Sequence, residues 1–259
     1  MSSGRTSRGE YMRRFSVYRC LEHQVNAVLF LVLVVTGLAQ KFHDTGWAEW
    51  LILHLGGIDT SRLIHRGAGV LFALFTLQHV VVGIYGILFR KWMPAMIINR
   101  KDFQDALSNL KYYFGLVDHP ARCDRYDYKQ KFEYWGVILG GMLMIVTGCI
   151  LWFPVSVFHL LPFLPGQVIP AAKAAHTNEA MLAFLIIVTW HIYNAVFSPE
   201  VFPLDTSIFT GKISVERMCH EHPLEYERRT GIKLPDPHSG RELEEESASA
   251  SETDNSPHG

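Results

Sequence analysis

The chain has 259 residues, and 49% of them are hydrophobic, which is enough for one compact domain. Several apolar runs are longer than the helices of a water-soluble protein need, so an integral membrane protein is indicated and an ordinary soluble protein is excluded. The formal net charge is −1, and the four cysteines show neither a C-x-x-C nor a C-x-x-C-H spacing. Covalent c-type haem attachment and a cysteine-held cluster are therefore not indicated. We expect no nucleic-acid partner.

Four apolar runs approach the roughly 20 residues that a bilayer-spanning helix needs. The run from Tyr134 to Ala172 is too long for one span and contains four prolines, so it predicts one helix followed by an outer loop. A short surface helix is expected from Trp47 to Leu55, and no strand is expected. The fold class is thus an all-α integral membrane protein, a four-helix transmembrane bundle with helices at about residues 15–39, 63–89, 132–153 and 172–197.

The bundle is expected to occupy residues 1–235, followed by a disordered acidic tail at 236–259 whose Ser/Glu-rich sequence cannot bury a core. The first apolar run lacks a small-residue cleavage site, which favours a retained helix over a signal peptide. Lys and Arg number 20 in the two terminal segments and the segment 90–131, against 3 in the intervening segments. The positive-inside rule then predicts a multi-pass inner-membrane protein with both termini in the cytoplasm.

Histidines carry the predicted chemistry, because an ionisable side chain inside a membrane is costly and so indicates function. On this topology His65 and His176 open the second and fourth helices near the outer face. His23 and His191 lie toward the inner face. Two imidazoles on facing helices can hold one haem iron, so the sequence predicts two depth-matched ligand pairs. A single membrane histidine would equally suit a buried hydrogen bond, whereas two matched pairs favour haem.

The two ligand candidates on the fourth helix, His176 and His191, are 15 residues apart. This interval spans about 22 Å at a helical rise of ~1.5 Å per residue, which suits two haems stacked across a hydrocarbon core about 30 Å thick. An interval of 14 would return to nearly the same helix face, whereas 15 overshoots by about 60°. Local unwinding or ligation from different angles must absorb the difference.

His79 offers an alternative inner ligand. It follows His65 by 14 residues, so it could replace His23 and place two ligands on each of two helices, as in the cytochrome b of quinol–cytochrome c reductases. At the helical rise it lies about 16 Å from Arg90, which is closer to the midplane than His191. We favour His23 over His79 for this reason.

An ordered set of motifs resembles the gamma, or cytochrome b556, subunit of respiratory formate dehydrogenases and, more distantly, the cytochrome b subunits of nickel-iron hydrogenases. The matching residues extend from the first helix almost to the C-terminal tail. They are Glu22-His23, Asn26-Ala27, Thr36-Gly37-Leu38, Leu63-Ile64-His65, the segment Tyr126 to Lys131, Gly148 through Trp152-Phe153-Pro154, His176, His191-Ile192-Tyr193, and His222-Pro223 with Tyr226.

This resemblance implies that His65 with His176 binds an outer haem b and that His23 with His191 binds an inner one. The family pattern does not require a histidine at position 79. The resemblance also implies that Asp127 and Gln130 line a quinone site beside His191. Two features depart from the family: the interval on the fourth helix is one residue longer, and Asp127 replaces an asparagine, which leaves the details of the quinone site open.

The sequence therefore predicts a membrane-anchoring subunit that transfers electrons between a periplasmic partner and the quinone pool, with two haem b groups as cofactors and menaquinone or ubiquinone as exchangeable substrate. The expected partners are an iron-sulfur or multihaem subunit, its catalytic subunit, and membrane lipid. A soluble substrate would be handled on another chain. A small helical transporter or metal-ion permease that uses the histidines is the alternative, but no Asp or Glu lies in the uncharged cores of the helices and no inverted repeat is visible. A haem-free anchor would leave the histidine pairs unexplained.

Overall fold

The computed structural model describes residues 10–163, 165–199 and 201–235. The expected acidic tail at 236–259 therefore lies outside the described residues. The chain divides into two compact units, one of residues 13–94 and 132–213 and the other of residues 1–12, 95–131 and 214–259. Each unit is described by itself.

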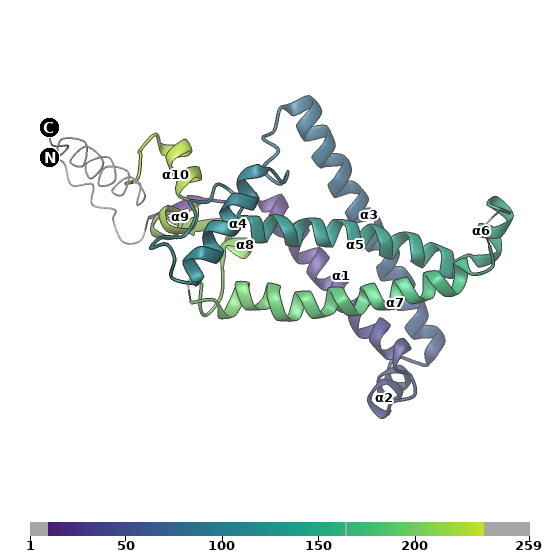
Figure 1. Cartoon of the computed structure of the whole chain (residues 1–259). Helices are drawn as coiled ribbons and strands as arrows, with labels where there is room; N and C mark the ends of the chain where they lie inside the picture. Colours follow the sequence, from purple (N-terminus) through teal and green to yellow (C-terminus); the bar gives the residue numbers. More distant parts are fainter. Residues whose placement is uncertain (1–9, 164, 200, 236–259) are drawn as a thin grey trace, which may run out of the picture. The chain divides into compact units, whose positions relative to one another are not determined.

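The larger unit contains the membrane-spanning helices (Figure 1). Four helices of the described chain are long and apolar enough to cross a membrane. The last of them continues through two π-helical segments, Ile187–His191 and Tyr193–Phe197. The four are α1 (Val17–Lys41), α3 (Ile58–Arg90), α5 (Tyr128–Trp152) and α7 (Val168–Ile186).

The four-helix prediction is confirmed, although the ends of the helices differ from the expected ones. Helix α3 begins at Ile58 and α7 at Val168, each about one turn earlier than predicted. Pro170 does not delay α7, because it lies in the first turn, where backbone N–H groups have no partner within the helix. A seven-residue helix, α6 (Pro154–Leu160), begins with a proline for the same reason and lies in the expected outer loop.

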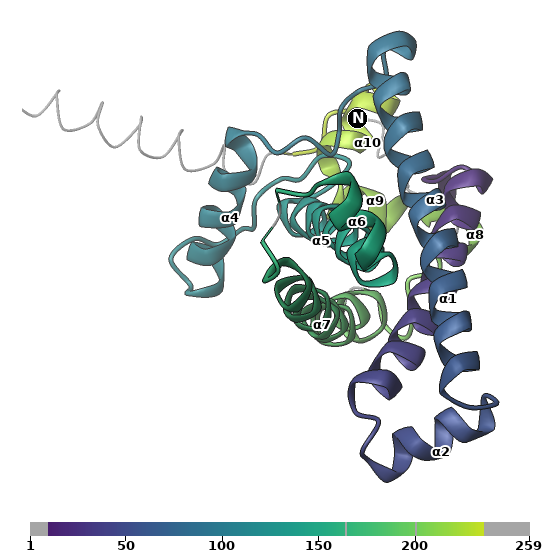
Figure 2. The same cartoon turned by 90° about the vertical axis from the view of Figure 1, so that its right-hand side faces the viewer.

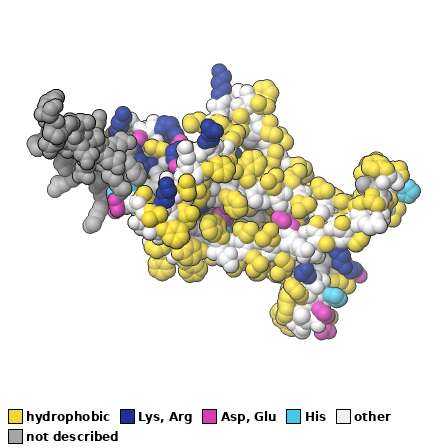
Figure 3. Space-filling view, in the orientation of Figure 1, with side chains coloured by type: hydrophobic (Ala, Val, Ile, Leu, Met, Phe, Trp, Pro, Cys, Tyr) yellow, Lys and Arg dark blue, Asp and Glu magenta, His cyan; other side chains and the backbone are white. Residues whose placement is uncertain are grey.

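Few side chains of the spans are buried within the protein, as is typical of helices whose apolar surface faces lipid. Hydrophobic side chains cover the visible faces of these helices (Figure 3). Helices α1 and α3 pack against each other, as both cartoon views show (Figures 1 and 2). The short helix α2 (Gly46–His54), expected from the sequence, closes their connection, where Ala39, Ala48 and Ile52 form a buried cluster.

The smaller unit contains helices that the sequence analysis treated as plain connections. They are α4 (Arg100–Tyr113), α9 (Val215–Glu221) and α10 (Pro223–Thr230), and the larger unit adds α8 (Ser207–Thr210). Asn99 caps α4 in a reciprocal capping box with Asp102. Asp102 also pairs with Lys131, whose Nζ lies 2.7 Å from Oδ1, and both side chains are buried.

Ion pairs join segments of the smaller unit that are distant in sequence. Arg125 donates to Glu225 at 2.6 Å, and Arg228 donates to Asp124 at 2.6 Å. Burial raises the pKa of the neighbouring Cys123 thiol to about 12, and the charge of Asp127 adds to this effect. The thiol is therefore neutral at physiological pH and a poor metal ligand.

The expectation that no strand occurs is wrong in detail. Residues of β1 (Tyr11–Arg13) and β2 (Lys212–Ser214) form a two-stranded sheet. Each strand has only three residues, too few for an alternating pattern to be recognised in the sequence. The pairing satisfies backbone N–H and C=O groups of both segments.

Candidate functional site: paired membrane histidines

His65 on α3 and His176 on α7 face each other in the larger unit. Their ring centroids are 6.4 Å apart and the ring planes are inclined by 72°. The Nδ1 atom of His65 lies 2.9 Å from the hydroxyl of Thr36, which itself donates to the carbonyl of Val32 at 2.7 Å. Because the hydroxyl has one proton and uses it there, it accepts the Nδ1–H of the imidazole. The Nε2 atom of His65 therefore carries a free lone pair.

The same contact supports His176 from α5. Its Nδ1 lies 2.9 Å from the Thr147 hydroxyl, which donates to the Leu143 carbonyl at 2.7 Å. A glycine follows each threonine, and a Cβ at Gly37 or Gly148 would lie 3.2 or 3.5 Å from the Cε1 of the adjacent histidine. The two Thr-Gly pairs therefore fix the orientation and the tautomer of both imidazoles.

His23 on α1 and His191 in the π-helical end of α7 form a second couple. Their ring centroids are 6.0 Å apart and the ring planes are inclined by 30°. His191 donates from Nδ1 to the carboxylate of Glu133, with the two atoms 2.5 Å apart. The Nδ1 atom of His23 is buried and has no hydrogen-bond partner in the described part of the chain. Glu133 was not among the residues predicted from the sequence, which placed it within the third helix without a role, and it is a direct partner of the candidate ligand His191.

His79 belongs to a separate polar cluster. Its Nδ1 lies 3.0 Å from the buried carboxylate of Glu22, and its Nε2 lies 3.0 Å from the hydroxyl of Tyr134. Arg19 also bonds to Glu22, at 2.6 Å, and lies 3.0 Å from the same His79 nitrogen. Both ring nitrogens of His79 are thus engaged in hydrogen bonds, which favours His23 as the partner of His191.

The π-helical segment Ile187–His191 accounts for the long interval on α7. A π-turn contains one residue more than the corresponding α-turn, since its hydrogen bonds join residues i and i+5. The 15 residues from His176 to His191 therefore complete about the rotation that 14 residues complete in a regular α-helix. The expected local unwinding is present at this position, and His191 faces the same side of the helix as His176.

The pair of helices α1 and α3 and the pair α5 and α7 share a repeated sequence pattern. Three residues of the first pair recur 111 positions later in the second: Glu22 as Glu133, Thr36 as Thr147, and His65 as His176. His79 recurs 112 positions later as His191, and the π-helical segment contains the additional residue. The hydrogen bonds recur as well, because Glu22 contacts His79 as Glu133 contacts His191. This constant offset is the sequence signal that would have revealed the threonines and Glu133.

The offset also shows where the two copies differ. The residue that corresponds to His23 is Tyr134. His191 is consequently paired with an imidazole and His79 with a phenol. At this position the first copy has His23, a second candidate metal ligand beside His191, whereas the second copy has Tyr134, which forms a hydrogen bond with His79.

Asp127 and Gln130, expected to line a quinone site, lie together at the start of α5 in the smaller unit. The backbone N–H of Gln130 donates to the Asp127 side chain at 2.7 Å, and the Asp127 N–H lies 3.3 Å from the Gln130 amide oxygen. These reciprocal bonds have the form of a helix N-cap. The role of the two residues at a quinone site stays a prediction.

Comparisons with known proteins identify the family of this chain. The family model of prokaryotic cytochrome b561 matches residues 14–211. A formate dehydrogenase cytochrome b556(fdo) subunit of Escherichia coli K12 is 27% identical over 185 residues, covering 71% of this chain and 78% of the relative. An F420 non-reducing hydrogenase II cytochrome subunit of Methanosarcina mazei is 24% identical, covering 91% of this chain and 94% of the relative. A formate dehydrogenase cytochrome b556 subunit of Haemophilus influenzae is 25% identical, covering 83% and 82%. With its four apolar helices, this chain belongs to the prokaryotic cytochrome b561 family of membrane proteins, which implies haem b binding and redox electron transfer.

Proposed function

We propose that the chain is the di-haem membrane subunit of a respiratory oxidoreductase complex, transferring electrons between a periplasmic redox partner and the quinone pool. The observation that carries this proposal is the spacing of the two histidine couples. A metal bonded to two opposed imidazole nitrogens at about 2 Å from each separates the ring centroids by about 6 Å. The couples have separations of 6.4 and 6.0 Å.

The chemistry of the donor set also fits haem. Each couple supplies two imidazoles from different helices, which together would hold one haem iron, whereas structural zinc takes four ligands. Haem, when bound, supplies one-electron transfer at each of the two levels. The role of the protein is to hold three of these four imidazoles in the ligating tautomer: Thr36 holds His65, Thr147 holds His176 and Glu133 holds His191.

The topology follows from the distribution of positive charge, which puts both termini in the cytoplasm of an inner-membrane protein. The His65–His176 couple then lies near the periplasmic face and the His23–His191 couple near the cytoplasmic face. The relatives are subunits of formate dehydrogenases and a hydrogenase. By analogy, this chain docks with a periplasmic iron-sulfur or multihaem subunit. Asp127 and Gln130 are the proposed polar contacts of the quinone, which takes up two electrons and two protons.

A pyridine haemochrome assay of the purified full-length protein tests the proposal. We expect two b-type haems per chain and, in the absorption spectrum of the native protein before pyridine is added, a low-spin form typical of two imidazole ligands. A chain that is folded by circular dichroism but binds no haem would exclude electron transfer and favour the transporter alternative. A single haem would exclude the di-haem scheme and leave the family assignment intact.

A further inference from the structure

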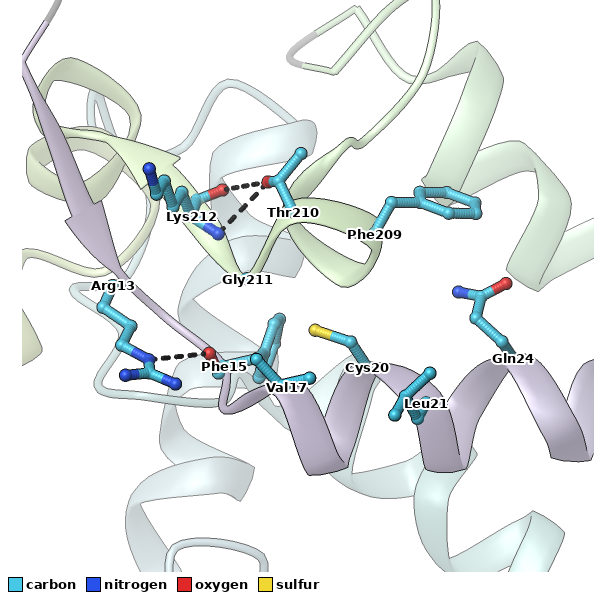
Figure 4. A pocket seen from close by; sticks show the side chains of 10 residues that line it. All are labelled: Arg13, Phe15, Val17, Cys20, Leu21, Gln24, Phe209, Thr210, Gly211 and Lys212. Atoms are coloured by element: carbon cyan, nitrogen blue, oxygen red, sulfur yellow. Dashed lines mark hydrogen bonds between the residues drawn. The ribbon is translucent and has the colours of Figure 1, made fainter.

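A cavity of about 360 Å³ opens beside the end of β1 and the first two turns of α1 (Figure 4). It lies between these turns and the segment of α8 and β2 that follows the last span. Its lining residues come from both segments: Arg13, Phe15, Val17, Cys20, Leu21 and Gln24 from the first, and Phe209, Thr210, Gly211 and Lys212 from the second.

Backbone hydrogen bonds build the floor of this cavity. The N–H groups of Arg14 and Phe15 both donate to the carbonyl of Gly211, at 2.8 and 3.1 Å. Gly211 has a φ of 73°, and a Cβ at this position would lie 2.8 Å from the Phe15 carbonyl oxygen. Only glycine fits this close approach, so the two walls are held together by the main chain.

Three features of the lining indicate the chemistry of a ligand. Arg13 and Lys212 are exposed, and neither forms an ion pair within the residues that the structure describes. Most of the wall between them and Gln24 is apolar and includes Val17, Leu21 and Phe209. Among the residues that the structure describes, no carboxylate lines the cavity.

Gln24 supplies a fourth feature. Its side chain lines the cavity at the end opposite Arg13 (Figure 4), and its amide nitrogen is buried without a hydrogen-bond partner in the described chain. A buried amide donor without a partner costs free energy, so a ligand that brings an acceptor to this atom would be stabilised.

We propose that the cavity binds one anionic phospholipid. The phosphate group contacts Arg13 and Lys212, a glycerol ester carbonyl accepts from Gln24, and an acyl chain lies along the apolar wall. A quinone would satisfy Gln24 and the apolar wall but leaves both cations unpaired, and a free phosphate would leave the wall uncovered. Basic pockets beside membrane helices are typical sites for anionic lipid head groups. This inference does not depend on the assignment of the haem ligands.

Native mass spectrometry of the full-length protein in detergent tests the site, with phosphatidylglycerol and phosphatidylcholine of identical acyl chains as probes. We expect one tightly bound phosphatidylglycerol per chain and much weaker phosphatidylcholine binding. The double substitution R13Q/K212Q should weaken phosphatidylglycerol binding roughly 30-fold, because each cation near the membrane surface contributes about a factor of five. Phosphatidylcholine binding should not change.

The matched control is R90Q/K91Q, which removes the same charge from the end of α3, outside the cavity. It should retain phosphatidylglycerol binding. An equal loss in the control would show diffuse charge attraction and overturn the proposal, as would full retention in R13Q/K212Q. An unchanged haem spectrum verifies that each variant is folded.

The variant Q24L separates the lipid from other occupants. It should weaken phosphatidylglycerol binding severalfold while the cations are intact, since the ester carbonyl then loses its donor. Unchanged binding in Q24L would overturn the contact with Gln24. Identification of a co-purified quinone in place of the lipid, lost in Q24L but not in R13Q/K212Q, would overturn the proposed occupant.

Discussion

The His65–His176 couple and the His23–His191 couple hold imidazoles at similar separations by different means. In the first, both Nδ1 atoms contact neutral threonine hydroxyls at 2.9 Å. In the second, one Nδ1 contacts the carboxylate of Glu133 and the other has no partner among the described residues. Two sites of the same ligand type therefore differ in the charge of the groups behind the ligands.

The repeated pattern explains the difference between the couples. His65 and His176 occupy equivalent positions of the two helix pairs, so their supporting residues are the same. His23 and His191 occupy different positions of the pattern, since the counterpart of His23 is Tyr134 and the counterpart of His191 is His79. The repeat therefore relates the second couple to the contact between His79 and Tyr134, where a phenol replaces one imidazole.

Substitution of a ligand histidine should have the largest effect, because it should change the haem content of one couple. We expect H65A or H176A to lose one of the two haems and H23A to lose the other, because one imidazole cannot complete the axial ligation. H79A should retain both, since its nitrogens contact Glu22 and Tyr134. Haem per chain and difference spectra of each purified variant measure the outcome. Full haem content in H23A with loss in H79A would reverse the assignment of the second couple.

The carboxylate of Glu133 should make the second couple the more electron-rich one. A hydrogen bond from a ligating imidazole to a carboxylate raises the basicity of the imidazole and stabilises the oxidised metal. We expect E133Q to raise the reduction potential of the haem held by His191 by about 60 mV, equivalent to a tenfold change for one electron. Redox titration monitored by absorbance measures the shift.

The matched control for E133Q is E22Q, which removes the equivalent carboxylate beside His79. It should leave both potentials within about 20 mV of the native values, or one-third of the E133Q effect. Equal shifts in the two variants would mean that buried charge, rather than the bond to His191, sets the potential.

The four spans and the five membrane histidines could be predicted from the sequence, because hydropathy and charge act locally along the chain. The hydrogen bonds that support the imidazoles could not be predicted. A threonine such as Thr36 and an acid such as Glu133 are common in helices, and their role depends on a partner that lies on another helix. The interval of 15 residues between His176 and His191 predicted local unwinding, but only the structure shows that it takes the form of the π-helical segment Ile187–His191. The capping box of α4 at Asn99 was readable in principle but lay within a segment treated as a connection.

Loss of a threonine contact should weaken haem binding without abolishing it. We expect T147V to lower the affinity for the haem held by His176 by about tenfold, because the imidazole loses the acceptor that fixes its tautomer. T147S retains the hydroxyl and should bind normally. The amount of haem retained during extensive washing in detergent gives the measurement, and normal retention in T147V would show that packing against Gly148 is sufficient.

Substitution of Gly37 or Gly148, the two glycines beside the first couple, should give the smallest effects on the haem absorption and reduction potential. A Cβ at Gly37 would lie 3.2 Å from His65 Cε1, which is closer than most real Cβ contacts, whereas a Cβ at Gly148 would lie at an ordinary 3.5 Å from His176 Cε1. We therefore expect G37A to tilt the imidazole of His65, to shift the haem absorption, and to shift the reduction potential by up to about 30 mV, roughly a threefold change for one electron. G148A should shift neither measurably. Both substitutions add one methyl group at equivalent positions of the repeat, so each serves as the control for the other. A larger effect of G148A than of G37A would contradict the two Cβ distances in this structure, because it would mean that α5 approaches the haem plane more closely than α1 does.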